Sequence, residues 1–268
     1  MGFGLGEKHL KGIDRFTIKW VAMISMFIDH VASGLVHKDT VAGQAVGICF
    51  NTIGRMAFPL FVYLLVDGFT RTKSKPKFFL RLLLFAVISE VPFDLMSSGR
   101  ILNIGYQNVM WTLLFGFAFM WATQLVLEDK FFDGVRGIAL VIPVLVGALF
   151  LLCGYAFRTD YSLYGVLCVI VQYIFVFISK KKPVIAHIRT DVLGLFFVIL
   201  ILTVMNHSEI FAAPALLLVM NYYRKADKKM PKWIGYAFYP AHLLMIGLLS
   251  IGLYRWTGGL IGKAFHVM

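Results

Sequence analysis

The segment R-F-T-I-K-W-V-A-M-I-S-M-F-I-D-H-V-A-S-G-L-V, Arg15 to Val36, decides the fold that we expect for this chain. It is long enough to cross a bilayer as a helix, because about 20 mainly apolar residues span the hydrocarbon core. Yet it carries Asp29 and His30 side by side, well inside the apolar run. Lipid does not solvate charge, so an ionisable pair at this depth predicts a functional site.

Lys19 lies on the same side of this predicted helix as His30. Eleven residues at about 100° each bring the two side chains within about 20° of one face, about 16 Å apart along the axis. The helix therefore presents a basic group near one entrance and an acid–base group deeper in. This arrangement favours a long ligand with an anionic head and a reactive tail.

The composition of the whole chain agrees with a membrane protein. Of 268 residues, 59% are hydrophobic and only 15% are charged, which is far from the composition of a soluble domain. The net charge of +12 comes from short basic clusters between apolar runs and not from one basic stripe, which argues against nucleic-acid binding. Cys49, Cys153 and Cys168 lie in apolar segments without a C-x-x-C pair, so we expect free thiols, no disulfide and no metal site.

We expect an all-α fold, a polytopic integral membrane helical bundle of about nine transmembrane helices (eight to ten) in a single domain over residues 1–268. The first apolar run lacks a small-residue cleavage site, so we expect it to remain as the first span. The eighth predicted span, Ile210–Tyr223, is short and contains Pro214, which suggests a tilted or re-entrant helix. The predicted spans are Phe16–Val36, Gly47–Phe69 (entered by a short segment from Val41 and bent at Gly54 and Pro59), Phe78–Met96, Val109–Leu127, Val135–Gly154, Tyr161–Ser179, Val192–Asn206, Ile210–Tyr223 and Ile234–Trp256.

The distribution of lysine and arginine predicts the orientation. With nine alternating spans the basic clusters all fall on one side, and the opposite loops hold isolated charges such as Lys38, Arg100 and Arg158. The positive-inside rule then puts the N-terminus in the cytoplasm and the C-terminus outside. The clusters are Lys8, Lys11, Arg15 and Lys19, the loop from Arg71 to Lys77, Lys180 to Lys182, and Arg224 to Lys229.

Polar side chains from six predicted spans reach a similar depth, in the middle to outer part of the membrane, at about 1.5 Å per residue. They are Asp29, His30, Arg55, Glu90, Asp94, Asn108, Thr112, Asp160 and His242. Such groups usually face the bundle interior and neutralise one another, so we expect Arg55 to pair with Glu90 or Asp29.

Each of these residues also has a structural interpretation. Arg55 would serve only as a structural ion-pair partner. Glu90 and Asp94 would cap a helix kinked at Pro92, and His242 would form a hydrogen bond between two helices. His207 and Glu209 are expected to be solvated in an outer loop.

Two blocks of sequence resemble the TraX family: G-R-M-A-F-P-L-F-V-Y-L-L-V-D-G-F (Gly54 to Phe69) and R-L-L-L-F-A-V-I-S-E-V-P-F-D-L (Arg81 to Leu95). Three further blocks follow in the family's order: N-V-M-W-T-L-L-F-G (Asn108 to Gly116), D-Y-S-L-Y-G-V-L (Asp160 to Leu167) and F-Y-P-A-H-L-L (Phe238 to Leu244). The resemblance covers nearly the whole chain and is most specific over residues 17 to 116. The chain departs from the family at Asp67, where a glutamate is expected, at Ser162, where a glycine is usual, and at Ala241, where a leucine is usual.

The family takes its name from an enzyme that acetylates the N-terminus of conjugative pilin. The resemblance implies an acetyltransferase in the bacterial cytoplasmic membrane that uses acetyl-CoA as co-substrate, without a metal. A basic residue eleven positions before a histidine also resembles a motif of the wider group of transmembrane acetyl-CoA-dependent acyltransferases. By that resemblance His30 is the catalytic histidine.

These observations together predict the site. The phosphates of acetyl-CoA would lie against Lys19 and the Arg71–Lys77 loop, and His30, oriented by Asp29 or Glu90, would act as general base or as a transient acetyl carrier. Arg55 or Asn108 would stabilise the oxyanion. The predicted catalytic residues are His30, Asp29, Glu90 and Arg55. The predicted substrate- and cofactor-binding residues are Lys19, Arg15, Arg71, Lys73, Arg81, Asn108, Thr112, Asp160 and His242.

The acceptor stays open between a peptide amine, such as a pilin-like N-terminus, and a sugar hydroxyl on an exported glycan. From other classes, a proton-coupled small-molecule transporter would use Asp29, Glu90 and His242 as a relay, although the sequence shows no inverted repeat. A structural accessory subunit of a pilus or secretion machine is a third alternative, but it would not need a buried His–Asp pair aligned with a lysine.

Overall fold

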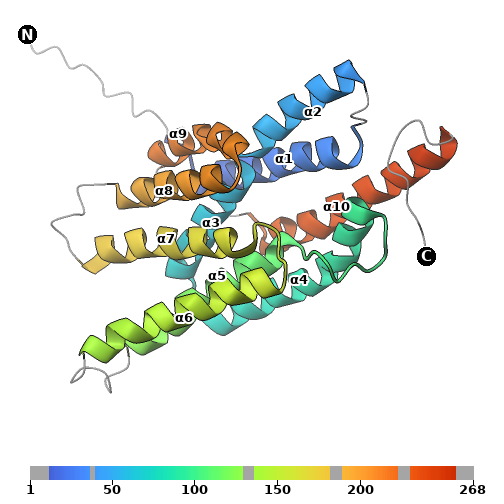
Figure 1. Ribbon diagram of the computed structural model, residues 1–268. Coiled ribbons are helices and arrows are strands. Elements are labelled where there is room, and N and C mark those ends of the chain that lie inside the picture. Colours follow the sequence, from blue (N-terminus) through green and yellow to red (C-terminus); the bar gives the residue numbers. More distant parts are fainter. Residues whose placement is uncertain (1–11, 37–39, 129–135, 182–188, 223–229, 258–268) are drawn as a thin grey trace, which may run out of the picture.

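The computed structural model describes residues 12–36, 40–128, 136–181, 189–222 and 230–257, and the regular elements in this part of the chain are helices, as predicted (Figure 1). In chain order the elements are α1 (Arg15–Gly34), α2 (Val41–Gly54), α3 (Ala57–Arg71), α4 (Lys75–Ser98), α5 (Val109–Glu128), α6 (Arg136–Ala156), α7 (Ser162–Lys181), α8 (Thr190–Met205), the 3-10 helix η3 (His207–Ala212), α9 (Pro214–Met220) and α10 (Lys232–Trp256). Seven of the predicted spans are confirmed as single helices, and the second and eighth are each divided in two.

Local sequence explains several helix ends. The side chain of Asp14 accepts a hydrogen bond from the backbone N–H of Thr17 at 2.8 Å and caps α1, and Thr40 caps α2 in the same way. Capping side chains satisfy N–H groups that have no partner inside the helix. At its other end α4 stops at Gly99, which has φ 71°, a left-handed conformation that glycine adopts without strain.

The predicted second span is divided between α2 and α3 at Arg55 and Met56. Pro59 supplies the reason, because proline has no N–H to donate to the carbonyl of Arg55 four residues earlier. The predicted bend at Gly54 and Pro59 is therefore confirmed as a break. It leaves Arg55 at a helix junction in the interior of the fold, followed by α3, in which nearly every residue is buried.

The predicted eighth span begins earlier than expected and consists of two short helices. Asn206 caps η3, and Pro214 opens α9, where a missing N–H costs no helical hydrogen bond. The predicted end of this segment at Tyr223 lies outside the described residues. Since η3 packs against α8 and α2, it turns Glu209 into the protein.

The helices pack around α3, which contacts α1, α5, α7 and α8. On one side of the molecule α10 lies against α4 and α1, as Figure 1 also shows. Helix ends that are far apart in the sequence meet at one end of the bundle. There the backbone N–H of Ile13 donates to the carbonyl of Asn221 at 2.8 Å, and Arg71 at the end of α3 donates to the hydroxyl of Tyr222.

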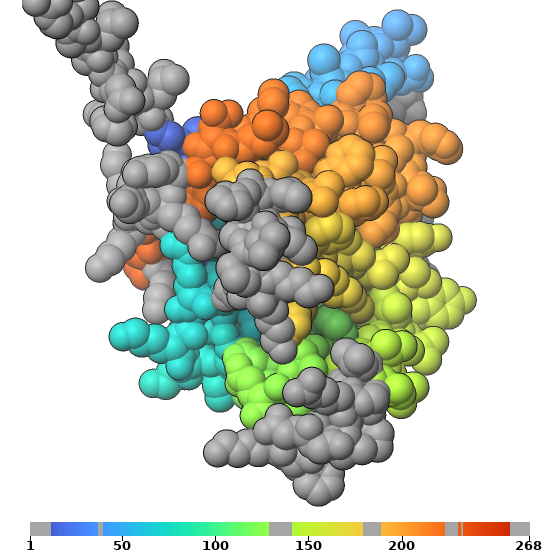
Figure 2. Space-filling model, turned by 90° about the vertical axis from the view of Figure 1, so that its left-hand side faces the viewer, coloured from blue at the N-terminus to red at the C-terminus, as the bar shows by residue number. Residues whose placement is uncertain are grey.

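Figure 2 looks toward this end of the molecule, with α4 in cyan low on the left and the α8–α9 region in orange above. It is the end that carries Arg15 and the Arg71–Lys77 loop, both predicted to face the cytoplasm. The other predicted basic clusters, Lys8 with Lys11, residues 180–182 and 224–229, lie wholly or partly outside the part of the chain that is described.

The outer surface of the helices is apolar. Large hydrophobic side chains are exposed at helical spacing on α4 (Leu80, Leu84, Val87, Ile88, Val91), on α6 (Val141, Val144, Leu145, Leu149, Leu152) and on α8 (Leu193, Phe196, Phe197, Leu200, Val204). In a water-soluble monomer such continuous exposed apolar surface is rare, whereas lipid solvates it.

Among the described residues, three helical segments are long and apolar enough to cross a membrane: Val41–Arg71, Val109–Glu128 and Trp233–Trp256. Four shorter apolar helices accompany them, Val141–Ala156, Ser162–Ile178, Thr190–Met205 and His207–Met220. These features define an all-α protein with several apolar helices. The count of nine spans stays a prediction.

Candidate functional site: a basic pocket and a buried histidine pair

A cavity of about 520 Å³ opens at the end of the bundle where α1 begins and α3 meets α4. Of the described residues that line it, six are lysine or arginine and none is aspartate or glutamate: Arg15, Lys19, Arg71, Lys73, Lys77 and Arg81. Its deeper wall is apolar and includes Met23, Phe61, Leu64, Leu65, Leu82, Met110 and Leu113. The volume lies within the range of small-molecule sites, and the lining suits a ligand with an anionic head and an apolar arm.

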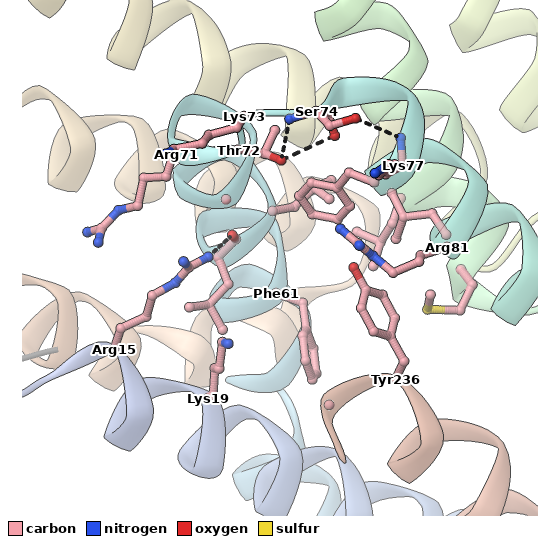
Figure 3. A pocket seen from close by; sticks show the side chains of 18 of the residues that line it. Arg15, Lys19, Phe61, Arg71, Thr72, Lys73, Ser74, Lys77, Arg81 and Tyr236 are labelled. Carbon is pink, nitrogen blue, oxygen red and sulfur yellow. Dashed lines mark hydrogen bonds between the residues drawn. The ribbon is translucent and has the colours of Figure 1, made fainter. Parts of the chain in front are cut away.

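Figure 3 shows how the basic side chains surround this cavity. Lys19 rises from α1 on one side, Lys73 and Lys77 lie at the opposite rim, and the guanidinium of Arg81 points toward the hydroxyl of Tyr236. Arg81 also lies over the rings of Phe78 and Tyr236, with its Cζ 5.7 and 6.0 Å from their centroids. Five of the predicted binding residues, Arg15, Lys19, Arg71, Lys73 and Arg81, thus line one pocket.

Asp67 holds two of these arginines. Its carboxylate lies 3.2 Å from Nε of Arg15 and 2.9 Å from Nε of Arg71, and Arg15 also donates to the carbonyl of Leu64 at 3.1 Å. The buried aspartate therefore fixes the start of α1 to the end of α3. A longer glutamate, which is expected in the family, would place the carboxylate differently between the two guanidinium groups.

A stripe of side chains on α1 leads from this pocket toward His30. Lys19, Met23, Met26 and His30 lie on one helix face, within about 40° of Lys19. Met23 is 2% exposed and Met26 is 7% exposed, so two buried methionines lie between Lys19 and His30 along this helix face. Methionine is flexible and unbranched, and it adapts its shape to a neighbour at little cost.

His30 forms a hydrogen bond with His242 of α10. Nδ1 of His30 lies 2.7 Å from Nε2 of His242, and the two rings are nearly coplanar, at 10°. On its other side Nδ1 of His242 lies 2.6 Å from the carbonyl oxygen of Phe238. His242 was predicted as a binding residue, and the structure makes it the neighbour of the predicted catalytic histidine.

Arg55 is the centre of a partly buried ion cluster, in which Glu209 is the fully buried member. Its guanidinium lies 3.0 Å from Oδ1 of Asp29 and 2.6 Å from Oε1 of Glu209, and its Nε donates to the carbonyl of Asn51 at 3.1 Å. Pairing with Asp29 was one of the two expected alternatives. The expectation that Glu209 is solvated is wrong: its side chain is 0% exposed, because η3 turns into the bundle, whereas His207 is exposed as expected.

Glu90 does not pair with Arg55, which corrects the other alternative. Its Oε1 accepts from the side-chain amide of Asn108 at 2.6 Å and from the indole of Trp111 at 2.6 Å. It therefore secures the first turn of α5 to α4, and the hydrogen bond that orients His30 comes from His242 instead. Asp94, one turn further along α4, accepts from the backbone N–H of Asn103 at 2.7 Å, which anchors the following loop.

Asn108 and Thr112 are fully buried and hold this end of the fold together. Both amide hydrogens of Asn108 have acceptors, the carbonyl of Ala86 at 2.8 Å and Glu90, and Thr112 donates to the carbonyl of Asp160. An oxyanion donor needs a free N–H, so this geometry favours Arg55 over Asn108 for that role. Substrate binding by Asn108 and Thr112 stays a prediction.

The loop before α7 brings Asp160 to the same region. The hydroxyl of Tyr106 donates to Oδ1 of Asp160 at 2.6 Å. Burial raises the pKa of Asp160, and the hydrogen bond from Tyr106 acts in the opposite direction. Arg158, Tyr161 and Ser162 all have positive φ, a conformation that is strained for residues with a side chain. A glycine, usual in the family at position 162, would adopt it freely.

Two observations concern metals and thiols. Within the described ranges, no group of three or more histidine, cysteine, aspartate or glutamate side chains is arranged to hold a metal ion. Cys49, Cys153 and Cys168 are free thiols, as expected, and Cys168 is buried.

Gly54 allows the cluster around Arg55 to form, because a Cβ at this position would collide with the side chain of Asp29. We expect Gly54→Ala to lower the free energy of unfolding by about 1–3 kcal/mol, the usual cost of overpacking. Gly252→Ala is the matched control, since nothing lies within 4 Å of its Cβ, and alanine there should be neutral or stabilising by up to about 1 kcal/mol. Denaturant unfolding in detergent measures both, and equal effects would contradict the close packing of Gly54 on Asp29.

Several apolar helices with polar and charged side chains between them are the features of a helical protein of the membrane type, and a basic pocket opens at one end of this bundle. The family model described as TraX protein matches residues 14–250, and the chain belongs to the TraX family. It is 25% identical over 248 residues to the "Probable fimbrial assembly protein FimC, serogroup H1" of Dichelobacter nodosus, a match that covers 86% of this chain and 93% of that protein. No solved structure matches the chain.

Proposed function

We propose that the chain, as a single membrane domain over residues 1–268, transfers an acetyl group from cytoplasmic acetyl-CoA to an acceptor amine reached from the outer side of the bacterial cytoplasmic membrane. His30 is the general base or the transient acetyl carrier. The pocket residues Arg15, Lys19, Arg71, Lys73 and Arg81 bind the donor, and Arg55 stabilises the oxyanion.

One observation carries this proposal: the basic pocket and His30 lie along one face of α1. Phosphate groups bind lysine and arginine strongly, and six such side chains line the cavity, two of which, Arg15 and Arg71, also pair with Asp67. The apolar deeper wall suits the arm that joins the phosphates of acetyl-CoA to its thioester. A nucleotide or phosphate alone would not need that wall, so the pocket supports a two-part donor.

The acyl end of the donor must then pass Met23 and Met26 to reach His30, about 16 Å from Lys19 along the helix. Both methionines are buried, so their side chains have to change rotamer when the donor enters. His30 itself is partly buried, whereas its neighbour His242 is 4% exposed, so His30 is the less enclosed of the two rings.

The chemistry follows the ordinary course of acyl transfer. The acceptor nitrogen attacks the thioester carbonyl, the N–C bond forms, and the C–S bond breaks. His30 takes the proton that the nitrogen loses and returns it to the departing thiolate. In the covalent variant the imidazole attacks first and the acceptor then displaces it.

The acceptor that we favour is a peptide amine of the pilin or fimbrial type. The TraX family and the name of the FimC relative both point to fimbriae, and the positive-inside rule places the end opposite the pocket outside the cell. A sugar hydroxyl on an exported glycan is the second candidate within the same chemistry. Parallel assays with a synthetic peptide and with an oligosaccharide, each with labelled acetyl-CoA, distinguish them by which product carries the label.

We expect coenzyme A to stabilise the detergent-solubilised protein against thermal unfolding, by about 2.7 kcal/mol when its concentration is 100 times the dissociation constant. Lys19→Ala and Lys73→Ala should each weaken this stabilisation, since a hydrogen bond to a charged group contributes about 1.5–3 kcal/mol. The measurement is the midpoint of unfolding with and without coenzyme A.

Arg100→Ala is the control for this experiment, because Arg100 is exposed, is absent from the pocket lining and follows the far end of α4. It should keep the full stabilisation. If coenzyme A does not stabilise the wild-type protein, or if Arg100→Ala reduces the effect as much as Lys19→Ala, the pocket is not a coenzyme A site.

A further inference from the structure

The two histidines and a backbone carbonyl form a continuous hydrogen-bonded row. It runs from the carbonyl of Phe238 to Nδ1 of His242 at 2.6 Å, and from Nε2 of His242 to Nδ1 of His30 at 2.7 Å. Both distances are those of well-formed hydrogen bonds. The row crosses from α10 to α1 and ends at Nε2 of His30.

The chemical identity of the carbonyl fixes where the protons lie. A carbonyl oxygen only accepts, so Nδ1 of His242 carries a proton and donates it. In an uncharged imidazole the other nitrogen then has a lone pair, so Nε2 of His242 accepts from Nδ1–H of His30. By the same step Nε2 of His30 is unprotonated and has its lone pair available, which is the form that a general base or a nucleophile requires.

The surroundings of His242 preserve this arrangement. Its side chain is 4% exposed, and aromatic rings enclose it. The ring of Phe238 stacks on it with centroids 4.7 Å apart, and the rings of Phe27 and Tyr239 contact it edge-on at 6.1 and 5.8 Å. Water therefore does not compete for either ring nitrogen, whereas His30 is partly exposed.

We propose that His242 is a positioning residue that holds His30 in the Nδ1–H tautomer, with Nε2 free for the reaction, and that it shares the proton taken up there. This inference deepens the proposed acetyl transfer and rests on it. It assigns different roles to the two rings, since only His30 touches the reacting atoms.

The proton balance of the step is complete. When Nε2 of His30 accepts the proton of the acceptor nitrogen, the Nδ1 proton of His30 is free to move onto Nε2 of His242. The positive charge is then spread over two rings, with Nδ1–H of His242 still donating to the Phe238 carbonyl. The protons return along the same row when His30 protonates the departing thiolate, so no other reactant is needed.

The test reads the tautomer directly. Nitrogen NMR on the full-length protein with ¹⁵N-labelled histidine, in lipid nanodiscs and without substrates, distinguishes protonated from unprotonated ring nitrogens. The resonances of His30 are those lost in His30→Ala. We expect an Nδ1–H, unprotonated Nε2 pattern for His30 in the wild-type protein, and loss of that pattern in His242→Phe, which keeps a ring of similar shape but accepts no hydrogen bond.

Acetyl transfer should fall about 10–100-fold in His242→Phe, by analogy with the partners that orient metal-binding histidines. His242→Gln provides the conservative comparison, because its amide oxygen accepts the bond from Nδ1–H of His30 but takes up no proton. It should restore the tautomer and part of the rate. Stabilisation by coenzyme A, whose pocket lies toward the other end of α1, should be unchanged in both variants and shows that they are folded.

An unchanged His30 tautomer in His242→Phe, or an unchanged rate of acetyl transfer, would overturn the inference. A wild-type protein that transfers no acetyl group to any acceptor would overturn the proposed function itself. The two failures are distinguishable because the tautomer is measured without donor or acceptor.

Discussion

Acetyl transfer is expected to fall by about 10²–10⁴-fold when His30 is replaced by alanine, because that is the usual contribution of a positioned general base. The neighbouring groups are already engaged: Asp29 pairs with Arg55, and Glu90 accepts from Asn108 and Trp111. The adjacent imidazole of His242 lies on the other helix, bound to the carbonyl of Phe238, so we do not expect it to replace His30. The rate is measured with labelled acetyl-CoA and a peptide acceptor on protein reconstituted in lipid, at saturating donor.

Two controls make this result specific. His207→Ala removes a histidine that is exposed beyond α8 and should leave the rate unchanged. Coenzyme A should still stabilise His30→Ala, because the pocket does not include position 30. Full activity in purified His30→Ala would exclude both the general-base and the acetyl-imidazole mechanisms, and would leave a transporter or an accessory role as the better interpretation of the buried polar groups.

The sequence predicted the helices well because their apolar runs are long and are separated by proline, glycine and basic residues. It also predicted that Lys19 and His30 share a face, since both lie on one uninterrupted helix and helical geometry alone decides it. The pocket residues were found for a related reason. Arg71 and Lys73 follow one span, Arg81 lies in the first turns of the next, and Arg15 and Lys19 begin the first, so all five belong to the same end of the bundle.

Contacts between helices distant in sequence were less predictable. Depth along a span places Glu90 and Asp29 at similar levels, but it does not say which of them faces Arg55. The rotation of α4 about its axis decides that, because it turns Glu90 toward Asn108 and Trp111 of α5, and this rotation depends on packing. Glu209 was missed because its segment is short and polar at the start. The sequence offered one clue: at this depth it places more carboxylates than arginines. A single arginine can pair with two carboxylates, as Arg55 does with Asp29 and Glu209.

The ion cluster should dominate the stability of the half of the bundle that lies away from the basic pocket. Arg55→Met keeps a long side chain but leaves Glu209, which is 0% exposed, without its ion pair; its Oε2 already has no hydrogen-bond partner among the described residues. Removing one member of a buried ion pair costs about 3–5 kcal/mol, because the remaining charge is neither solvated nor compensated. We expect a loss of that size in the free energy of unfolding, measured with denaturant in detergent.

A double-mutant cycle separates the charge from the packing. If the cost of Arg55→Met comes from the stranded carboxylate, then adding Glu209→Gln, which removes the charge at nearly constant volume, should recover part of it. The coupling between neighbours of this kind is typically about 0.5–3 kcal/mol. Arg100→Met serves as the control, since an exposed arginine without such partners should change stability by no more than about 0.5 kcal/mol. Equal losses in Arg55→Met and in the double variant would mean that Arg55 acts through packing alone. A recovery would show that the charges of Arg55, at the α2–α3 break, and Glu209, on η3, are coupled. Because Arg55 also pairs with Asp29, next to His30, this coupling fixes the part of α1 that carries His30 against the rest of the bundle.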